Sequence, residues 1–368
     1  MEIDQGLTTY MNQAIHGIVR QAVATAIGNP SELAFLIKFN QVRQKAQERR
    51  SSQEAEDGTH VPPFLIASIT SNCNLFCTGC YARANGICHD NSTKTPMPAA
   101  EWEALFSQAQ DLGVVFILLA GGEPLLRREV LQMASRFKRI IFPIFTNGTL
   151  VDVEYLELFH AHRNLLPIIS LEGTELSTDA RRGVGVYATL IQTMRAMEKR
   201  GIFHGVSLTV TQRNLDEITS DNFIKQLDEA GSRVVFFIEY VPVAVGTEDL
   251  APDDACRGRL EARQTELRRQ YRDMLFLSFP GDEKKMGGCL AAGRGFFHIN
   301  TDGSAENCPF SPYSDRNIRT STLLEVLKSP LFRALRDERL VGGEHIGGCA
   351  LFERKDDVQR ILVQIQSG

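Results

Sequence analysis

The chain has 368 residues, 43% of them hydrophobic, and its 40 Lys and Arg against 45 Asp and Glu give a formal net charge of −5. This balance argues against a general nucleic-acid binder, which needs a basic face, but leaves room for local basic patches, and the length favours a globular protein of two or three domains. No apolar run approaches the ~20 residues of a membrane span, and the N-terminus lacks the charged and apolar segments of a signal peptide. We therefore expect no transmembrane segment and a cytoplasmic location.

Residues 1–60 are expected to form a pair of amphipathic helices followed by a linker. Apolar residues recur at helical spacing within 7–27, and Pro30 followed by Ser31 predicts the start of a second helix. The polar stretch 49–58 lacks large apolar residues and indicates the linker. We expect the helices to pack on their own domain, although such a pair can also lie on a membrane or bind a leader peptide.

Residues 61–250 alternate between short apolar runs and amphipathic segments. The runs predict strands at 64–69, 114–119, 140–145, 166–171, 206–210 and 234–241, and helices are expected near 99–112, 126–138, 152–162, 186–200 and 221–230. Six β-α repeats predict an α/β fold, a partial (β/α)6 TIM-like barrel with parallel strands inside and helices outside. In such a barrel the chemistry gathers at the C-terminal ends of the strands.

Three cysteines follow the first predicted strand with the spacing C-x3-C-x2-C: Cys73, Cys77 and Cys80. A short loop with three thiolates suits an iron–sulfur cluster and leaves one iron of a [4Fe–4S] cluster without a protein ligand. Structural zinc, which favours two CxxC pairs, and free thiols are the alternatives. A redox CxxC at Cys77 and Cys80 would leave Cys73 unexplained.

Polar motifs follow the next three predicted strands. They are Gly121-Gly122-Glu123-Pro124, Thr146-Asn147-Gly148-Thr149 and Ser170-Leu171-Glu172-Gly173. With the cysteine run, their order resembles the radical S-adenosylmethionine (SAM) superfamily over roughly residues 64–240. The barrel also predicts, independently of the resemblance, that these motifs converge at the C-terminal ends of the strands.

The resemblance implies a [4Fe–4S] cluster on Cys73, Cys77 and Cys80, whose open iron binds the amino and carboxylate groups of SAM. One electron, from a partner such as flavodoxin or ferredoxin, would split SAM into methionine and a 5′-deoxyadenosyl radical. The residues implied at the SAM site are Gly121, Gly122, Glu123, Pro124, Thr146, Asn147, Ser170, Glu172 and Thr209, with Ser207 as an alternative on the fifth strand. A capping or turn role is the other interpretation of the polar side chains.

The sequence departs from the family pattern beside the third cysteine. Many members carry an aromatic residue immediately before it, which packs on the adenine, whereas this chain has Gly79. Tyr81 or Phe76 is expected to replace that contact.

Residues 251–368 are expected to form a helical linker and a small cluster domain. A charged helix at 253–271 precedes a hairpin in which strands 296–300 and 305–308 flank the turn Asp302-Gly303, and short helices are expected at 323–328 and 331–338. This tail resembles the SPASM/Twitch extensions of radical SAM enzymes. The resemblance implies one auxiliary iron–sulfur cluster on Cys289, Cys308 and Cys349.

The fourth ligand of this auxiliary cluster stays open. Cys256, Cys88, a non-cysteine side chain or the substrate are the options, and both cysteines can equally be ordinary small buried residues. Zinc is the alternative metal for the tail.

Two features are candidates for the substrate site. The loop 179–185 resembles the D-x-x-R-G loop of SPASM-type members, and Glu239 and Tyr240 end the sixth predicted strand at the same mouth. Either side chain could bind substrate or exchange a proton.

These features favour a radical SAM oxidoreductase or maturase that abstracts hydrogen from a peptide or a small molecule, assisted by the auxiliary cluster. The alternative is a non-catalytic iron–sulfur or zinc protein built on a barrel.

Overall fold

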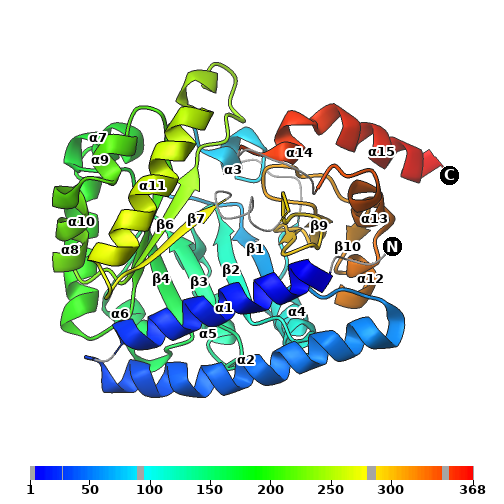
Figure 1. The fold of residues 1–368 in the computed structure, drawn as a ribbon, viewed down its shortest axis with the longest axis horizontal. Coiled ribbons are helices and arrows are strands. Elements are labelled where there is room, and N and C mark those ends of the chain that lie inside the picture. The colour runs from blue at the N-terminus through cyan, green and yellow to red at the C-terminus, as the bar shows by residue number, and fades with distance from the viewer. Residues whose placement is uncertain (1–4, 27, 89–94, 280–286, 342–347, 368) are drawn as a thin grey trace.

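A ten-stranded sheet organises the protein (Figure 1). The structure, a computed structural model, describes residues 5–26, 28–88, 95–279, 287–341 and 348–367. The strand order is β10-β9-β8-β1-β2-β3-β4-β5-β6-β7. The parallel part comprises β1 (Phe64–Thr70), β2 (Phe116–Gly121), β3 (Phe142–Thr146), β4 (Leu165–Leu171), β5 (Gly205–Val210), β6 (Val234–Glu239) and β7 (Leu275–Phe279). The predicted α/β fold with a partial barrel is confirmed. The seventh parallel strand was not predicted.

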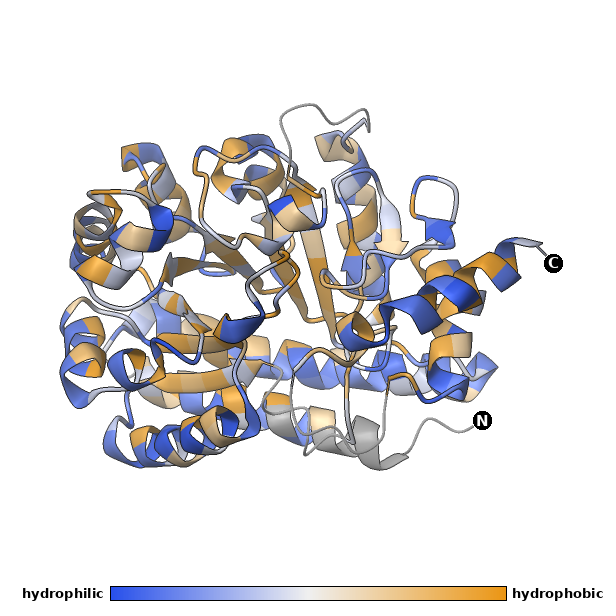
Figure 2. Ribbon diagram, turned by 90° about the horizontal axis from the view of Figure 1, so that it is seen from above, coloured by the Kyte–Doolittle hydropathy of each residue, from blue (hydrophilic) through white to orange (hydrophobic). Residues whose placement is uncertain are grey.

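Helices cover the outer face of the parallel strands. They are α4 (Ala99–Leu112), α5 (Arg128–Ala134), α6 (Val153–Ala161), α7 (Glu175–Arg182), α8 (Val186–Lys199), α9 (Leu215–Ile218), α10 (Asp221–Glu229) and α11 (Asp254–Gln270). Alternate strand residues such as Ile117, Leu119 and Val206 are buried against these helices in one hydrophobic core. Figure 2 shows the hydrophobic strands surrounded by helices of mixed hydropathy.

Two N-terminal helices close the base of the barrel. α1 (Gln5–Thr25) and α2 (Pro30–Asp57) run below the sheet (Figure 1), and Ile15, Val19 and Phe39 pack on residues at the starts of the strands. The prediction that this pair packs on its own protein is confirmed. The predicted linker at 49–58 is wrong, because α2 continues to Asp57 and ends at Gly58 in a left-handed conformation.

The end of α2 is helical because one of its polar residues docks on the barrel. The buried Arg50 donates from Nη1 to the Gly113 carbonyl at 2.5 Å and from Nη2 to Asn12 at 2.9 Å. Gly113 ends α4 with φ +89°, and a Cβ there would lie 2.4 Å from the Ala46 carbonyl oxygen. Close approach of α2 to α4 therefore requires this glycine.

The C-terminal tail extends the same sheet. β8 (His298–Ile299) pairs in parallel with β1, and β9 (Ser304–Glu306) pairs with β8 in the predicted hairpin, followed by β10 (Arg316–Asn317). α12 (Leu323–Leu327) and α13 (Pro330–Asp337) match the predicted short helices, and α14 (Ala350–Glu353) and α15 (Lys355–Ser367) complete the chain. The division at residues 60 and 250 stays a prediction, and β7 carries the barrel strands beyond residue 250.

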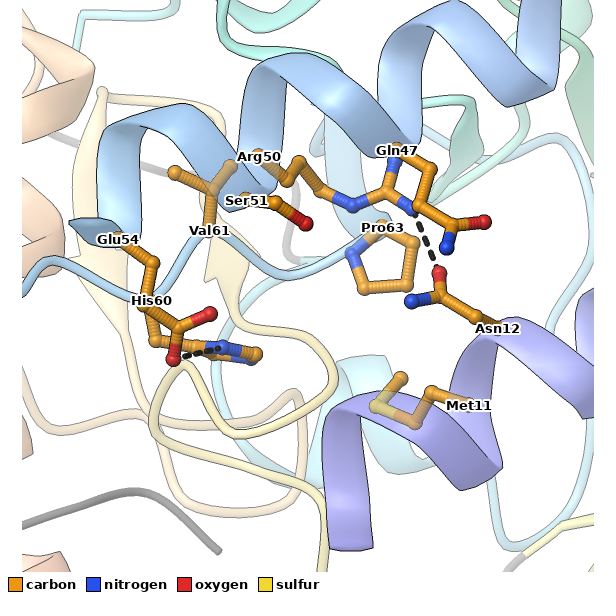
Figure 3. Close-up of a pocket in the computed structure, with 9 residues that line it drawn as sticks. All are labelled: Met11, Asn12, Gln47, Arg50, Ser51, Glu54, His60, Val61 and Pro63. Carbon is orange, nitrogen blue, oxygen red and sulfur yellow. Dashed lines mark hydrogen bonds and ion pairs between the residues drawn. The ribbon is translucent and has the colours of Figure 1, made fainter. Parts of the chain in front are cut away.

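A small pocket lies between α1, α2 and the segment that enters β1 (Figure 3). In it the ring of His60 faces Glu54, with 3.6 Å between Nδ1 and Oε1, and Nε2 lies 2.9 Å from the Arg294 carbonyl. The pocket lies beside the segment that leads into β1, whereas the predicted functional motifs lie after the strands.

No helix within the described ranges is long and apolar enough to cross a membrane.

Candidate active site at the C-terminal ends of the strands

Residues 73–80 carry the three cysteines, and we call this segment the cluster loop. It lies between β1 and the short helix α3 (Tyr81–Ala84). All three thiols are partly buried. Burial raises the pKa of Cys77, Arg182 opposes this, and the charges of Cys80 and Cys73 raise it further. The three sulfurs thus lie within electrostatic reach of one another.

The GGEP turn after β2 docks on the start of the cluster loop. Gly122 N donates to the Thr70 carbonyl at 2.7 Å, and Glu123 N donates to the Asn72 carbonyl at 2.8 Å. A Cβ on Gly122 would lie 2.0 Å from the Asn72 oxygen. Only glycine therefore permits this approach of one backbone to the other. Pro124 begins the following 3-10 turn, η1 (Pro124–Leu126).

The side chain of Glu123 is buried and connects the GGEP turn to the motif that follows β3. Its Oε1 accepts from Thr146 Oγ1 at 2.6 Å and from Leu125 N at 3.0 Å, and its Oε2 accepts from Asn147 N at 2.7 Å. Burial raises the pKa of Glu123 to about 7, although these three hydrogen bonds lower it. The carboxyl group is therefore poised between its neutral and charged forms near neutral pH.

Asn147 links the third strand to the cluster loop. Its Nδ2 lies 3.9 Å from Cys73 Sγ and donates to Asn74 Oδ1 at 2.8 Å, and Asn74 in turn donates to Thr149 at 2.9 Å. The predicted convergence of the first three motifs is thus present in the structure.

The remaining predicted SAM residues lie on β4 and β5 or just after β4. Ser207 Oγ donates to Ser170 Oγ at 3.2 Å, and Thr209 is half-buried, with its carbonyl accepting from Asn214 at 2.8 Å. Glu172 differs from the others, because Arg181 and Arg182 use both of its carboxylate oxygens.

The aromatic residues around the cluster loop take different positions. Tyr81 packs on Phe310 of the tail with ring centroids 5.0 Å apart, and Phe76 is 69% exposed with Arg83 above its ring. A Cβ on Gly79 would lie 2.7 Å from the hydroxyl of Tyr240. That buried hydroxyl has no hydrogen-bond partner among the described residues.

Glu239, the other candidate at the end of β6, is also buried. Its Oε2 accepts from Arg257 Nε of α11 at 2.9 Å and from Gly348 N at 3.2 Å. It therefore joins the barrel to the residue before Cys349.

The three tail cysteines also lie near one another. The pKa of Cys308 is raised well above its usual value, mainly by burial. Its hydrogen bond to Cys349 and the charge of Cys289 raise it further. The same hydrogen bond lowers the pKa of Cys349. The two groups of cysteines are connected through Tyr81 and Phe310, and by Asn85 Nδ2, which donates to the Pro309 carbonyl at 2.9 Å.

The structure separates the two unassigned cysteines. Cys88 packs beside Cys73, Cys80 and Tyr81, and its thiol donates to Cys73, which is the main reason that the pKa of Cys73 falls to about 6. Cys256 is buried in the hydrophobic core on α11. The only sequence signal for the position of Cys88 beside the first group of cysteines is its short distance along the chain, eight residues after Cys80.

The cluster loop fits a soft metal centre in the chemistry of its donors. The described residues contain no ready-made group of three His, Cys, Asp or Glu side chains around a metal position. However, three thiols share one short loop, and N–H groups of Asn147 and Arg182 approach Cys73 and Cys77 at 3.9 and 4.0 Å. Thiolates with such donors suit an iron–sulfur cluster.

Comparison with known proteins agrees with this geometry. The model of the radical SAM superfamily matches residues 67–239. The chain is 25% identical over 327 residues to the AdoMet-dependent heme synthase of Methanosarcina barkeri, covering 81% of this chain and 90% of that protein. It is 23% identical over 287 residues to the antilisterial bacteriocin subtilosin biosynthesis protein AlbA of Bacillus subtilis, covering 75% and 61%.

The fold is also that of solved radical SAM structures. The structure of Streptococcus suis SuiB bound to S-adenosylmethionine matches with a TM-score of 0.67 and 19% identity, covering 83% of this chain and 77% of that one. Residues 67–239 therefore form a radical SAM domain, and the chain has homologues among the SPASM/Twitch-containing maturases.

Proposed function

We propose that this protein reductively cleaves SAM and abstracts hydrogen from a peptide or small-molecule substrate, as an oxidoreductase or maturase. The observation that carries the proposal is the junction of the cluster loop, the GGEP turn and Asn147 through Glu123. When bound to Cys73, Cys77 and Cys80, a [4Fe–4S] cluster supplies the electron that splits SAM. A donor such as flavodoxin or ferredoxin would provide that electron.

The chain's own residues would bind and orient SAM. Gly121 and Gly122 bring main-chain groups close to the cluster loop, and the charged form of Glu123 would accept from the SAM ammonium. Thr146 and Asn147 hold Glu123 in place, Pro124 fixes the turn, and Ser170 and Thr209 line the neighbouring strand ends. The hydroxyl of Tyr240, which has no hydrogen-bond partner among the residues that the structure describes, is the group that we propose to contact SAM or substrate beside Gly79.

The tail would hold an auxiliary iron–sulfur cluster on Cys289, Cys308 and Cys349. Support comes from the effects of Cys349 and Cys289 on the pKa of Cys308, and from the hydrogen bond between Cys308 and Cys349. The contacts of Tyr81 and Asn85 with the segment 309–310 would keep this cluster beside the barrel mouth.

Relatives offer two substrate classes. AlbA is a bacteriocin biosynthesis protein and SuiB has been solved with the precursor peptide SuiA, whereas the matched Methanosarcina barkeri protein is a heme synthase. We therefore propose a ribosomal peptide and a tetrapyrrole as the two candidates to be compared.

The test is anaerobic reconstitution followed by dithionite and SAM, with 5′-deoxyadenosine measured. We expect the product from the wild-type chain and none from the variants C73A, C77A and C80A. If a wild-type chain that holds its first cluster formed no 5′-deoxyadenosine, the proposed SAM cleavage would be refuted. The alternative, a non-catalytic metal-binding protein, would then stand. Adding candidate peptides or porphyrins in separate reactions should raise the yield for the true substrate class.

A further inference from the structure

A group of charges that the sequence did not predict joins the residue after β4 to the end of α7. Glu172, Arg181 and Arg182, which we call the latch, have side chains that are 4%, 22% and 12% exposed. Arg182 donates to Glu172 Oε1 from Nε at 3.0 Å and from Nη2 at 2.5 Å, and Arg181 donates to Oε2. Both carboxylate oxygens are thus used by guanidinium groups, which bind carboxylates strongly.

The latch is also hydrogen-bonded to the cluster loop. Thr78 N donates to the Arg181 carbonyl at 3.0 Å, and Arg181 Nε donates back to the Thr78 carbonyl at 3.0 Å. Arg182 Nη1 lies 4.0 Å from Cys77 Sγ. Two consecutive residues of the latch therefore hold two consecutive residues of the loop.

The segment that presents the two arginines is itself fixed. Asp179 accepts from Gly185 N at 2.6 Å and from Tyr187 N at 2.8 Å, which joins the end of α7 to the start of α8. The loop 179–185, a candidate for the substrate site, carries both arginines, which contact Glu172, and Arg182 also approaches Cys77.

The charges of the latch do not cancel. Two guanidinium groups and one carboxylate leave one positive charge on the group, and the guanidinium of Arg182 lies beside a cysteine sulfur in a partly buried site. A cation or N–H donor next to a ligand sulfur stabilises the more negative, reduced form of an iron–sulfur cluster.

We propose that the latch is a positioning device for the cluster loop and that Arg182 raises the reduction potential of the cluster bound there. This inference rests on the cluster of the proposed function but not on SAM cleavage. A higher potential would ease electron uptake from the donor, so Arg182 would set how readily the first cluster is reduced.

The test compares R182Q with R182K in the full reconstituted chain, by iron content and by a redox titration followed by electron paramagnetic resonance. The signal of the first cluster is the one that the C80A variant lacks. We expect R182Q to retain its iron and to shift this signal to a more negative potential, while R182K, which keeps the charge, shifts less. R213Q removes an arginine from the exposed pair with Asp249 and should leave the potential unchanged.

Two results would overturn the role of Arg182 in setting the potential. They are an unchanged potential in R182Q with iron retained, and equal shifts in R182Q and R213Q. A shifted potential in R182Q together with no SAM cleavage by the wild type would refute the proposed function and leave the latch standing. SAM cleavage by the wild type with no shift in R182Q would do the reverse.

Discussion

Single residues hold the candidate site together through contacts that allow little change. Glu123 joins Thr146, Asn147 and the turn after β2, while Gly122 lies against the Asn72 carbonyl. The importance of both was predictable from the order of the motifs. The bonds of Glu172 were not, because its partners lie at the end of α7, a helix between β4 and α8 that was not predicted.

Glu123 should make stability depend on pH. Its pKa is raised from 4.5 to about 7 by burial, so the folded protein favours the neutral carboxyl, and this stabilisation is lost as the pH rises from 4.5 through 7. In the metal-free protein, the unfolding free energy should fall between pH 5 and pH 8 by up to about 3 kcal/mol less in E123Q than in the wild type. Urea unfolding at the two pH values measures this difference.

The matched control is E32Q, because burial also raises the pKa of Glu32 on α2 to about 7. It should flatten the same decline yet leave SAM binding intact, whereas E123Q should weaken SAM binding. Equal SAM affinities in the two variants would remove Glu123 from the SAM site.

Gly122 should tolerate no side chain. In G122A the Cβ would meet the Asn72 oxygen at 2.0 Å, and the turn must move away from the cluster loop, at a cost of about 1–3 kcal/mol. We expect weaker SAM binding in calorimetry and a lower unfolding free energy. In G258A of α11, where a Cβ meets nothing within 4 Å, stability should stay equal or rise. If G122A behaved like G258A, the close approach would be unimportant.

At the scale of elements, periodicity predicted most strands and helices because barrel strands are short apolar runs between amphipathic segments. The runs after β6 were harder to interpret: β7 follows a charged helix and is only five residues long. The end of α2 was predicted as a linker for want of large apolar residues, yet its Gln, Glu, Arg and Ala favour helix and Arg50 anchors it. Pairing of β8 with β1 joins residues more than 230 apart and leaves no local signal.

The N-terminal pair should contribute to stability rather than to chemistry. Phe39 is 1% exposed and packs on Phe116 with ring centroids 5.8 Å apart. F39A should lower the unfolding free energy by about 3–5 kcal/mol, while the folded fraction binds iron normally. Thermal unfolding with iron analysis tests this, and F76A, at an exposed ring, should change stability little. A stable F39A variant would mean that the helices are not held by this core.

At the scale of the whole molecule, the C-terminal ends of the strands bring together one group of cysteines from the barrel and one from the tail. The tail hairpin continues the sheet next to β1, the strand that leads into the cluster loop. The two groups are therefore placed beside each other by one sheet. The resemblance of the tail implied a position beside the barrel mouth, but the sequence did not predict the pairing of β8 with β1.

Two clusters should give about eight irons per chain, and one about four. Replacing Cys289, Cys308 and Cys349 together with Ala should remove about half of the iron. The 5′-deoxyadenosine that forms in the absence of substrate should be unchanged, because the first cluster remains. C256A, in a helix of the core, should keep the full content. A triple variant with undiminished iron would exclude the auxiliary site.

The central claim is that three cysteines leave one iron open to SAM at the junction built by Glu123. Electron–nuclear double resonance of the reduced wild-type protein, with SAM labelled by 15N in its amino group and 17O in its carboxylate, measures this directly. The account predicts that both labels couple magnetically to the cluster. An intact first cluster to which neither label couples would show that the fourth iron is closed, for example by Cys88, and would contradict the account.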